Sequence, residues 1–254
     1  MTMASKKKLR SIASEFRAFC KANADEQRAQ RYDRYFTEGY DAWGIPKEIW
    51  EQKKAELIEL YSEELSLDDV LELGDLLMRS GKYEEASVSI LLAQADNDVF
   101  TPEAFQGAGE WLETGIRNWA HTDILCGYVL SGAIERKIVN LEDMAAWRES
   151  GSKWKRRAVP VTMVDLVKKA RSVRSMLKFV RPMMMDDDRF VQQGIGWFLR
   201  EAWKRQPEPV ESLLMKYKDT APRKIYQYAT EKMTKEQRVK YRRARKSAPK
   251  KARS

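Results

Sequence analysis

The sequence lacks the features of membrane, secreted and disulfide-rich proteins. Its 254 residues include only two cysteines, Cys20 and Cys126, which lie far apart without a CxxC motif, so neither a disulfide framework nor a zinc site is predicted. The most apolar stretch, 124–134, is about half as long as the roughly 20 residues that a membrane-spanning helix needs. Residues 1–10 are basic but lead into a mixed-charge segment, unlike a secretory signal. We therefore expect no membrane association and a cytoplasmic location, nucleoid-associated if bacterial.

Sequence motifs of several enzyme classes are also missing. There is no Walker loop and no GxGxxG, GxSxG or HExxH motif, so nucleotide hydrolysis, dinucleotide redox chemistry and zinc hydrolysis have no support. The only histidine, His121, is expected on the surface or in a helix cap rather than as a base. The run Asp186–Asp188 has no further ligands at a suitable spacing. The sequence therefore predicts no metal and no cofactor.

The positive charge is confined to the end of the chain. The chain has 47 Lys and Arg against 38 Asp and Glu, a net charge of +9. Residues 234–254 hold ten basic residues and one acid, Glu236, which accounts for all of that charge. Such a segment attracts phosphate backbones without reading sequence, but it serves equally well for solubility or for contact with acidic proteins. The tail alone does not decide the function.

The spacing of apolar residues predicts an all-α protein. Apolar residues recur three and four positions apart, and no segment shows a sustained period of two. We expect helices of about 12 to 18 residues that stack as antiparallel hairpins. Residues typical of helix ends separate them at Ala24–Asp25, Gly44–Pro46, Ser66, Ser80–Gly81, Thr101–Pro102, Gly151–Ser152, Asp186–Asp188 and Thr220–Pro222.

A repeat of about 36 residues underlies this pattern. The aromatic residues Tyr83, Trp119, Trp154 and Phe190 follow one another at separations of 36, 35 and 36 residues. In most units a small residue comes four positions later and a branched aliphatic residue five positions later, which is typical of a closely packed helix in a two-helix repeat. We therefore predict a superhelical stack of antiparallel helix pairs, a HEAT-like or ARM-like α-solenoid, over residues 1–233, followed by the basic tail.

Three residues depart from the repeat pattern. Asp123 occupies the slot where other units have Ser, Ala or Gly, and a carboxylate is costly to bury unless it is paired or used. Trp197 stands where other units have Ile, Cys or Val, and Arg157 comes one position before the small residue of its unit. If the aromatic-led helices stack side by side, these residues converge with Trp119 on one concave wall.

These residues also carry a family resemblance. The chain resembles the AlkD-like DNA alkylation repair enzymes, DNA glycosylases built from HEAT-like repeats, through most of residues 25–233. The resemblance places the catalytic aspartate at Asp123, active-site tryptophans at Trp119 and Trp197, and a phosphate-contacting arginine at Arg157. It departs at Ala120, where members often have Asp. Its most specific segments are Asn118–Asp123, Trp154–Ala158 and Phe190–Glu201.

The second of these segments is assigned to DNA binding. Arg157 is expected to contact a phosphate, with Trp154 and Arg156 beside it, although packing is the favoured role of Trp154 because aromatics at repeat positions usually face the core. Asp123 has an alternative role as a helix N-cap, since Asp is a preferred capping residue. Capping and catalysis are compatible.

The implied chemistry suits a single carboxylate. A purine alkylated at N3 or N7 is already cationic and leaves without protonation, so Asp123 needs only to stabilise the oxocarbenium-like sugar and orient water. We expect a monomeric glycosylase acting on duplex DNA with alkylated purines, without a cofactor. The alternatives are a non-catalytic HEAT-like module that binds DNA or unusual DNA structures, and a protein-binding scaffold.

Overall fold

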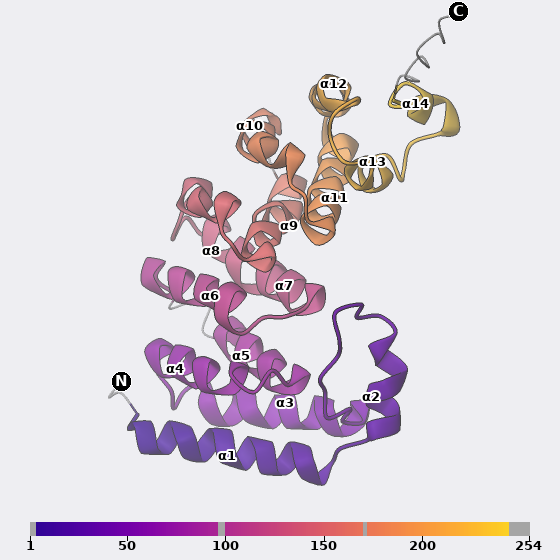
Figure 1. Ribbon diagram of the computed structural model, residues 1–254. Coiled ribbons are helices and arrows are strands. Elements are labelled where there is room, and N and C mark those ends of the chain that lie inside the picture. The colour runs from indigo at the N-terminus through magenta and orange to yellow at the C-terminus, as the bar shows by residue number, and fades with distance from the viewer. Residues whose placement is uncertain (1–3, 96–99, 170–171, 244–254) are drawn as a thin grey trace, which may run out of the picture.

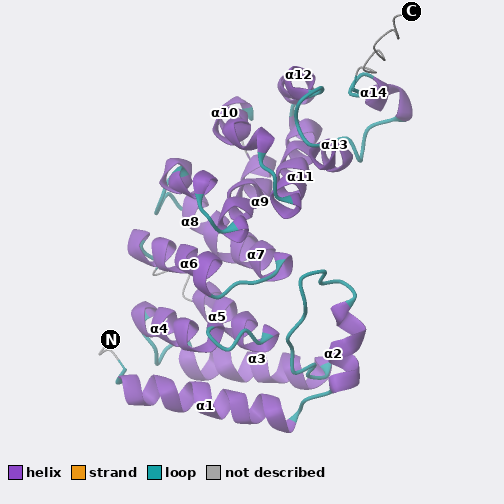
Figure 2. Cartoon of the chain, in the orientation of Figure 1, coloured by secondary structure: helices purple, strands orange, loops and turns teal. Residues whose placement is uncertain are grey.

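The computed structural model describes residues 4–95, 100–169 and 172–243, and it confirms the all-α prediction. Within these residues the chain forms helices and loops and no strand (Figure 2). The α-helices are α1 (Lys6–Ala22), α2 (Glu26–Asp33), α3 (Lys47–Tyr61), α4 (Leu67–Met78), α5 (Tyr83–Ala95), α6 (Pro102–Thr114), α7 (Trp119–Leu125), α8 (Ser131–Glu135), α9 (Lys153–Lys169), α10 (Arg174–Val180), α11 (Arg189–Arg205), α12 (Pro207–Tyr217), α13 (Arg223–Ala229) and α14 (Lys235–Val239). A π-helical turn, Cys126–Leu130, joins α7 to α8, and 3-10 turns lie at Leu141–Met144, Ala146–Glu149 and Arg181–Met185.

The helices form two layers that rise from the N-terminus to the C-terminus (Figure 1). In one layer α3, α5, α7, α9, α11 and α13 each contact the next helix of the series. In the other layer α1 contacts α4, α4 contacts α6, and α10 contacts α12. Contacts between the layers pair α4 with α5, α6 with α9, and α11 with α12. This is the expected superhelical stack of helix pairs.

The helices begin at the capping residues that the sequence indicated. Ser66 caps α4 in a capping box with Asp69, Thr101 caps α6, and Asp188 caps α11 through the backbone N–H groups of its first turn. Each such cap contributes about 1 kcal/mol to stability. The suggestion that Asp123 is an N-cap is wrong: Asn118 caps α7, and Asp123 lies within the helix.

The repeat positions coincide with the starts of helices in the layer formed by α3, α5, α7, α9, α11 and α13, which we call the inner layer. Tyr83 and Trp119 are the first residues of α5 and α7, and Trp154 and Phe190 are the second residues of α9 and α11. The small residue Gly194 allows the close approach of α9 and α11, because a Cβ there would lie 3.2 to 3.4 Å from side-chain atoms of α9. The 36-residue register therefore reflects the stacking of neighbouring helices.

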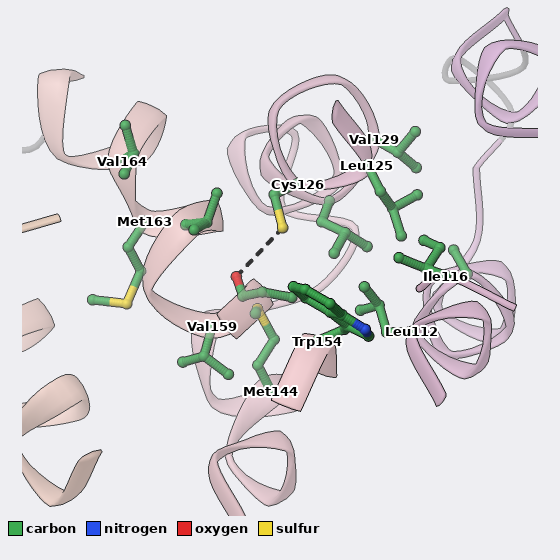
Figure 3. Packing of buried hydrophobic residues seen from close by; sticks show 14 of the residues in the cluster. Leu112, Ile116, Leu125, Cys126, Val129, Met144, Trp154, Val159, Met163 and Val164 are labelled. Atoms are coloured by element: carbon green, nitrogen blue, oxygen red, sulfur yellow. Dashed lines mark hydrogen bonds between the residues drawn. The ribbon is translucent and has the colours of Figure 1, made fainter. Parts of the chain in front are cut away.

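A continuous hydrophobic core runs between the two layers. Figure 3 shows Trp154 inside it, close to Leu112 and Met144, and the Trp154 side chain is almost fully buried. Burial of a large apolar side chain contributes roughly 1.5 to 3 kcal/mol. Cys126 is fully buried in the same region, and both cysteines are free thiols.

The first ten residues of the basic tail pack on the body. Tyr241 is 1% exposed and lies against Tyr226, and Arg243 donates a hydrogen bond of 2.8 Å to the carbonyl oxygen of Ala221. Residues 244–254, with the other five basic residues of the tail, lie outside the described residues. None of the helices in the described part of the chain combines the length and apolarity that a membrane crossing requires.

Candidate active site

One cavity of about 400 Å³ brings together four residues that the sequence singled out. They come from three consecutive helices of the inner layer: Trp119 and Asp123 from α7, Arg157 from α9, and Trp197 from α11. The other residues that line the cavity are Tyr35, Thr37, Arg189, Phe190, Gln193, Arg200 and Tyr228. The stacking of equivalent repeat positions thus builds a polar and aromatic site.

Asp123 and Arg157 form a two-pronged ion pair across this site. The Nε and Nη2 atoms of Arg157 donate hydrogen bonds of 2.9 and 2.8 Å to Oδ1 and Oδ2 of Asp123. The Asp123 side chain is 17% exposed and the Arg157 side chain 6%. Burial raises the pKa of the Asp123 carboxyl above its usual value, and the Arg157 guanidinium opposes this rise.

Arg157 makes a third hydrogen bond within the protein. Its Nη1 atom donates to the carbonyl oxygen of Phe190 at 2.6 Å. Three of the five N–H groups of a guanidinium are therefore used by protein acceptors. The resemblance implied a phosphate contact for Arg157, whereas in this structure Asp123 is its main partner.

Trp119 is held against a loop that follows α2. Its indole Nε1 donates a hydrogen bond of 3.2 Å to the carbonyl oxygen of Tyr35, and the ring of Phe36 stacks on it at 5.7 Å between centroids. The loop, residues 34–46, rises from α2 toward α7 (Figure 2). One face of the indole is thereby covered by Phe36, and the side chain is only partly buried.

Several contacts fix the loop at this position. The buried carboxylate of Glu84 accepts hydrogen bonds of 2.9 and 2.8 Å from the backbone N–H groups of Trp43 and Gly44. Gly44 has a φ of 74°, and a Cβ there would lie 2.2 Å from a backbone oxygen of α2's cap, so only glycine fits. Glu38 forms an ion pair with Lys153 at the start of α9. The loop therefore closes one side of the cavity.

One face of α11 forms the opposite side. Arg189, Gln193, Trp197 and Arg200 are spaced by four, four and three residues, and this spacing places them on a single helix face. Tyr228 joins them because Gly196 lets α13 come close: a Cβ at Gly196 would lie 2.5 Å from Cβ of Tyr228. The site thus has two tryptophans, one carboxylate and three arginines on its walls.

Comparisons with known proteins identify the family of the chain. The sequence profile of the family described as DNA alkylation repair enzyme matches residues 17–233. The chain belongs to this family. A solved structure described as a predicted DNA alkylation repair enzyme from Enterococcus faecalis superposes with a TM-score of 0.69 at 18% identity, covering 84% of this chain and 98% of that chain. At this identity the likeness is one of fold. A search of curated proteins gives no match.

The family resemblance is therefore confirmed, and membership supports a role in the repair of alkylated DNA. The helical solenoid-like fold is also confirmed. The matched region ends at residue 233, and residues 234–243 of this family member continue to pack on the body beyond it.

Two residues assigned to DNA binding lie outside the cavity. Arg156 donates to the carboxylate of Asp186 at 2.8 Å and to the carbonyl oxygen of Ser150 at 2.8 Å. Trp154 is 6% exposed, with its ring 5.0 Å from that of Phe190. Both line a separate cavity of about 770 Å³ at the start of α9. A DNA contact for Trp154 and Arg156 stays a prediction.

His121 lies neither on the surface nor at the cavity. Of its two expected places the surface is wrong, and the helix cap is right, since its backbone N–H donates to Oδ1 of Asn118, the N-cap of α7. It is 1% exposed, its Nε2 lies 3.0 Å from Oγ of Ser87, and its Nδ1 lies 2.8 Å from Nδ2 of Asn118. Because the Ser87 hydroxyl donates to the carbonyl of Tyr83, Nε2 of His121 donates and Nδ1 accepts. Burial lowers the pKa of His121 to about 4, so the ring is a neutral structural link between α5 and α7.

The described residues hold no group of three or more His, Cys, Asp or Glu side chains placed to bind a metal ion. The cavity-lining residues that sequence reasoning missed are of two kinds. Arg189, Gln193 and Arg200 could have been found from their helical spacing to Trp197. Tyr35 reaches the site because of the path of the 34–46 loop. Tyr228 reaches it because Gly196 allows α13 to come close.

Proposed function

We propose that this protein is a DNA glycosylase that hydrolyses the N-glycosidic bond of N3- or N7-alkylated purines in duplex DNA. The observation that carries the proposal is the Asp123 carboxylate in a cavity that Trp119 and Trp197 also line. Family membership supports alkylated DNA as the substrate. The layer of inner helices that bears the cavity is the surface proposed to receive the duplex.

The proposed chemistry needs one carboxylate. An alkylated purine departs as a neutral base, and the sugar that it leaves develops oxocarbenium character. Asp123 stabilises this positive charge and orients the attacking water. The faces of Trp119 and Trp197 hold the cationic nucleotide by cation–π and dispersion contacts, worth about 0.5 to 2 kcal/mol each.

The environment of Asp123 suits this role. A carboxylate must be ionised to stabilise a cation, and burial works against ionisation by raising its pKa. The Arg157 guanidinium, 2.8 Å away, favours the ionised form and fixes the orientation of both oxygens. Low solvent access also strengthens the interaction between the carboxylate and the developing positive charge.

The first prediction tests the carboxylate directly. Purified protein is expected to release free alkylpurine from methylated duplex DNA, and Asp123→Asn is expected to lower this release at least about 100-fold, because the neutral amide cannot offset the charge of the sugar. Release is measured by separating the free base from the DNA by chromatography. Asp165→Asn in α9 is the matched control, since among the described residues Asp165 forms an ion pair with Lys168 alone and lies outside the cavity.

Undiminished release by Asp123→Asn would rule out the proposed role of the carboxylate. A second function has one observation in its favour: both Asp123 oxygens are already bonded to Arg157, an arrangement that a purely structural ion pair would also have. That function is a non-catalytic module that binds DNA. It predicts salt-dependent duplex binding by the wild-type protein without any release of base.

A further inference from the structure

Three arginines line the cavity, and they differ in how far the protein itself uses their guanidinium groups. Arg157 donates three hydrogen bonds to protein acceptors and has a side chain that is 6% exposed. Arg200 forms ion pairs with Glu201 and Glu231. A phosphate at either residue would meet a guanidinium whose charge is already paired with a carboxylate of the protein.

Arg189 is the exception. It is exposed at the first position of α11, and among the described residues its guanidinium has no hydrogen-bond or ion-pair partner. It lies 5.1 Å from the centre of the Phe190 ring, a contact that holds it at the rim of the cavity. All five of its N–H groups are therefore available to a ligand.

The position of Arg189 is not explained by stability. A cation in the first turn of a helix opposes the helix dipole, and α11 has no acidic residue in that turn to compensate. The nearest acid, Asp188, uses its carboxylate to cap the backbone N–H groups of Phe190 and Val191. A free guanidinium at this point fits the recognition of an anion, for which arginine offers a fork of donors.

We propose that Arg189 binds a backbone phosphate of the DNA strand held in the cavity, and that Arg157 is a positioning residue for the Asp123 carboxylate. The proposal rests on the proposed function, which supplies the duplex DNA. Arg189 and Trp197 lie on one face of α11 eight residues apart, about 12 Å along the helix axis. The bound strand therefore runs along α11, with a phosphate at Arg189 and a nucleotide at Trp197.

The second prediction measures phosphate binding without using catalysis. The dissociation constant of a labelled, unmodified 20-base-pair duplex is followed by fluorescence anisotropy at increasing salt. Arg189→Gln is expected to weaken binding about tenfold at low salt and to reduce the slope of log K against log salt by about 0.9, because one phosphate contact is lost. In the base-release assay, Arg189→Gln is expected to raise the DNA concentration needed for half-saturation rather than to lower the maximal rate.

The matched control is Arg181→Gln. Arg181 is also exposed and has no ion-pair partner among the residues that the structure describes, but it lies at the end of α10, in the other helix layer. Its removal makes the same charge change and is expected to leave the slope as in the wild type. An Arg189→Gln slope equal to that of Arg181→Gln would overturn the proposal for Arg189.

Arg157 is tested by Arg157→Lys and Arg157→Gln, with circular dichroism to confirm folding. Both variants are expected to keep the wild-type salt slope and to lower the maximal rate of base release. The Lys variant loses the two-pronged geometry but keeps the charge, so it is expected to retain more activity than the Gln variant. A slope reduced by about 0.9 in Arg157→Gln, at an unchanged maximal rate, would instead make Arg157 the phosphate contact. If the wild type releases no base, the proposed glycosylase function fails, and the salt slopes still decide between Arg189 and Arg157.

Discussion

The buried imidazole of His121 makes the stability of the protein depend on pH. The folded protein holds the ring neutral with a pKa of about 4, whereas the unfolded chain has an ordinary histidine pKa near 6.5. The unfolded state therefore binds more protons than the folded state between these values. Stability from this residue is fully present above about pH 6.5 and is lost as the pH falls toward 4.

The third prediction follows from this difference. The free energy of unfolding, measured in urea at a series of pH values, is expected to fall between pH 6.5 and 4 by about 3 kcal/mol more in the wild type than in His121→Gln, whose side chain does not titrate. Carboxylates that titrate in the same range contribute equally to both proteins. Parallel pH profiles for the two proteins would mean that the folded state accommodates a charged His121.

At the residue scale, the sequence predicted the centre of the site but not its rim. Trp119, Asp123, Arg157 and Trp197 line one cavity because they occupy related positions in successive repeats, and stacked repeats bring such positions together. The partner of Arg157 was not predicted, since hydrogen bonds between side chains depend on rotamers that the repeat does not specify. Tyr35 depends on the path of a loop, which has no periodicity to read.

At the scale of elements, close packing between α11 and α13 depends on one glycine. Gly196 lies in the middle of α11, where a Cβ would meet Cβ of Tyr228 at 2.5 Å and the carbonyl oxygen of Ile225 at 2.7 Å. The backbone oxygen cannot move aside as a flexible side chain would. A methyl group here must push α13 away and displace Tyr228 from the cavity.

The fourth prediction uses this contact. Gly196→Ala is expected to destabilise the protein by about 2 kcal/mol, since overpacking outweighs the gain in helix propensity. Gly132→Ala is the control, because a Cβ at Gly132 in α8 would meet only the end of the Arg136 side chain at 3.8 Å, and it is expected to be neutral or slightly stabilising. Urea unfolding measures both. Equal stability of the two variants would show that α13 does not pack against Gly196 as described.

The order of the elements followed from the sequence more closely than their lengths did. The starts of α4, α6, α7 and α11 could be predicted from capping residues and from the repeat of aromatic residues, because these signals act within a few residues. Several helices are shorter than expected, and the segment from α7 to α8 contains a π-helical turn. The spacing of apolar and capping residues does not specify such local changes.

At the scale of the whole molecule, packing on the body continues into the basic tail. It extends at least to Tyr241, since Tyr241 is buried against Tyr226 and Arg223 donates a hydrogen bond of 2.9 Å to the carbonyl oxygen of Tyr241. Half of the basic residues of 234–254 therefore belong to a packed surface. The other five follow within 244–254.

The fifth prediction separates these two parts by truncation. Removal of residues 244–254 is expected to lower the salt slope of duplex binding by up to about 4.5, because at most five phosphate contacts are lost. Removal of residues 234–254 is expected, in addition, to lower the free energy of unfolding by about 2 kcal/mol, because the burial of Tyr241 is lost. If removal of residues 244–254 alone abolished duplex binding, the inner layer that bears the cavity would not bind DNA by itself. A protein-binding scaffold would then become the better interpretation. Retained binding with a reduced slope would place the main contact on the inner helices, where Asp123 lies.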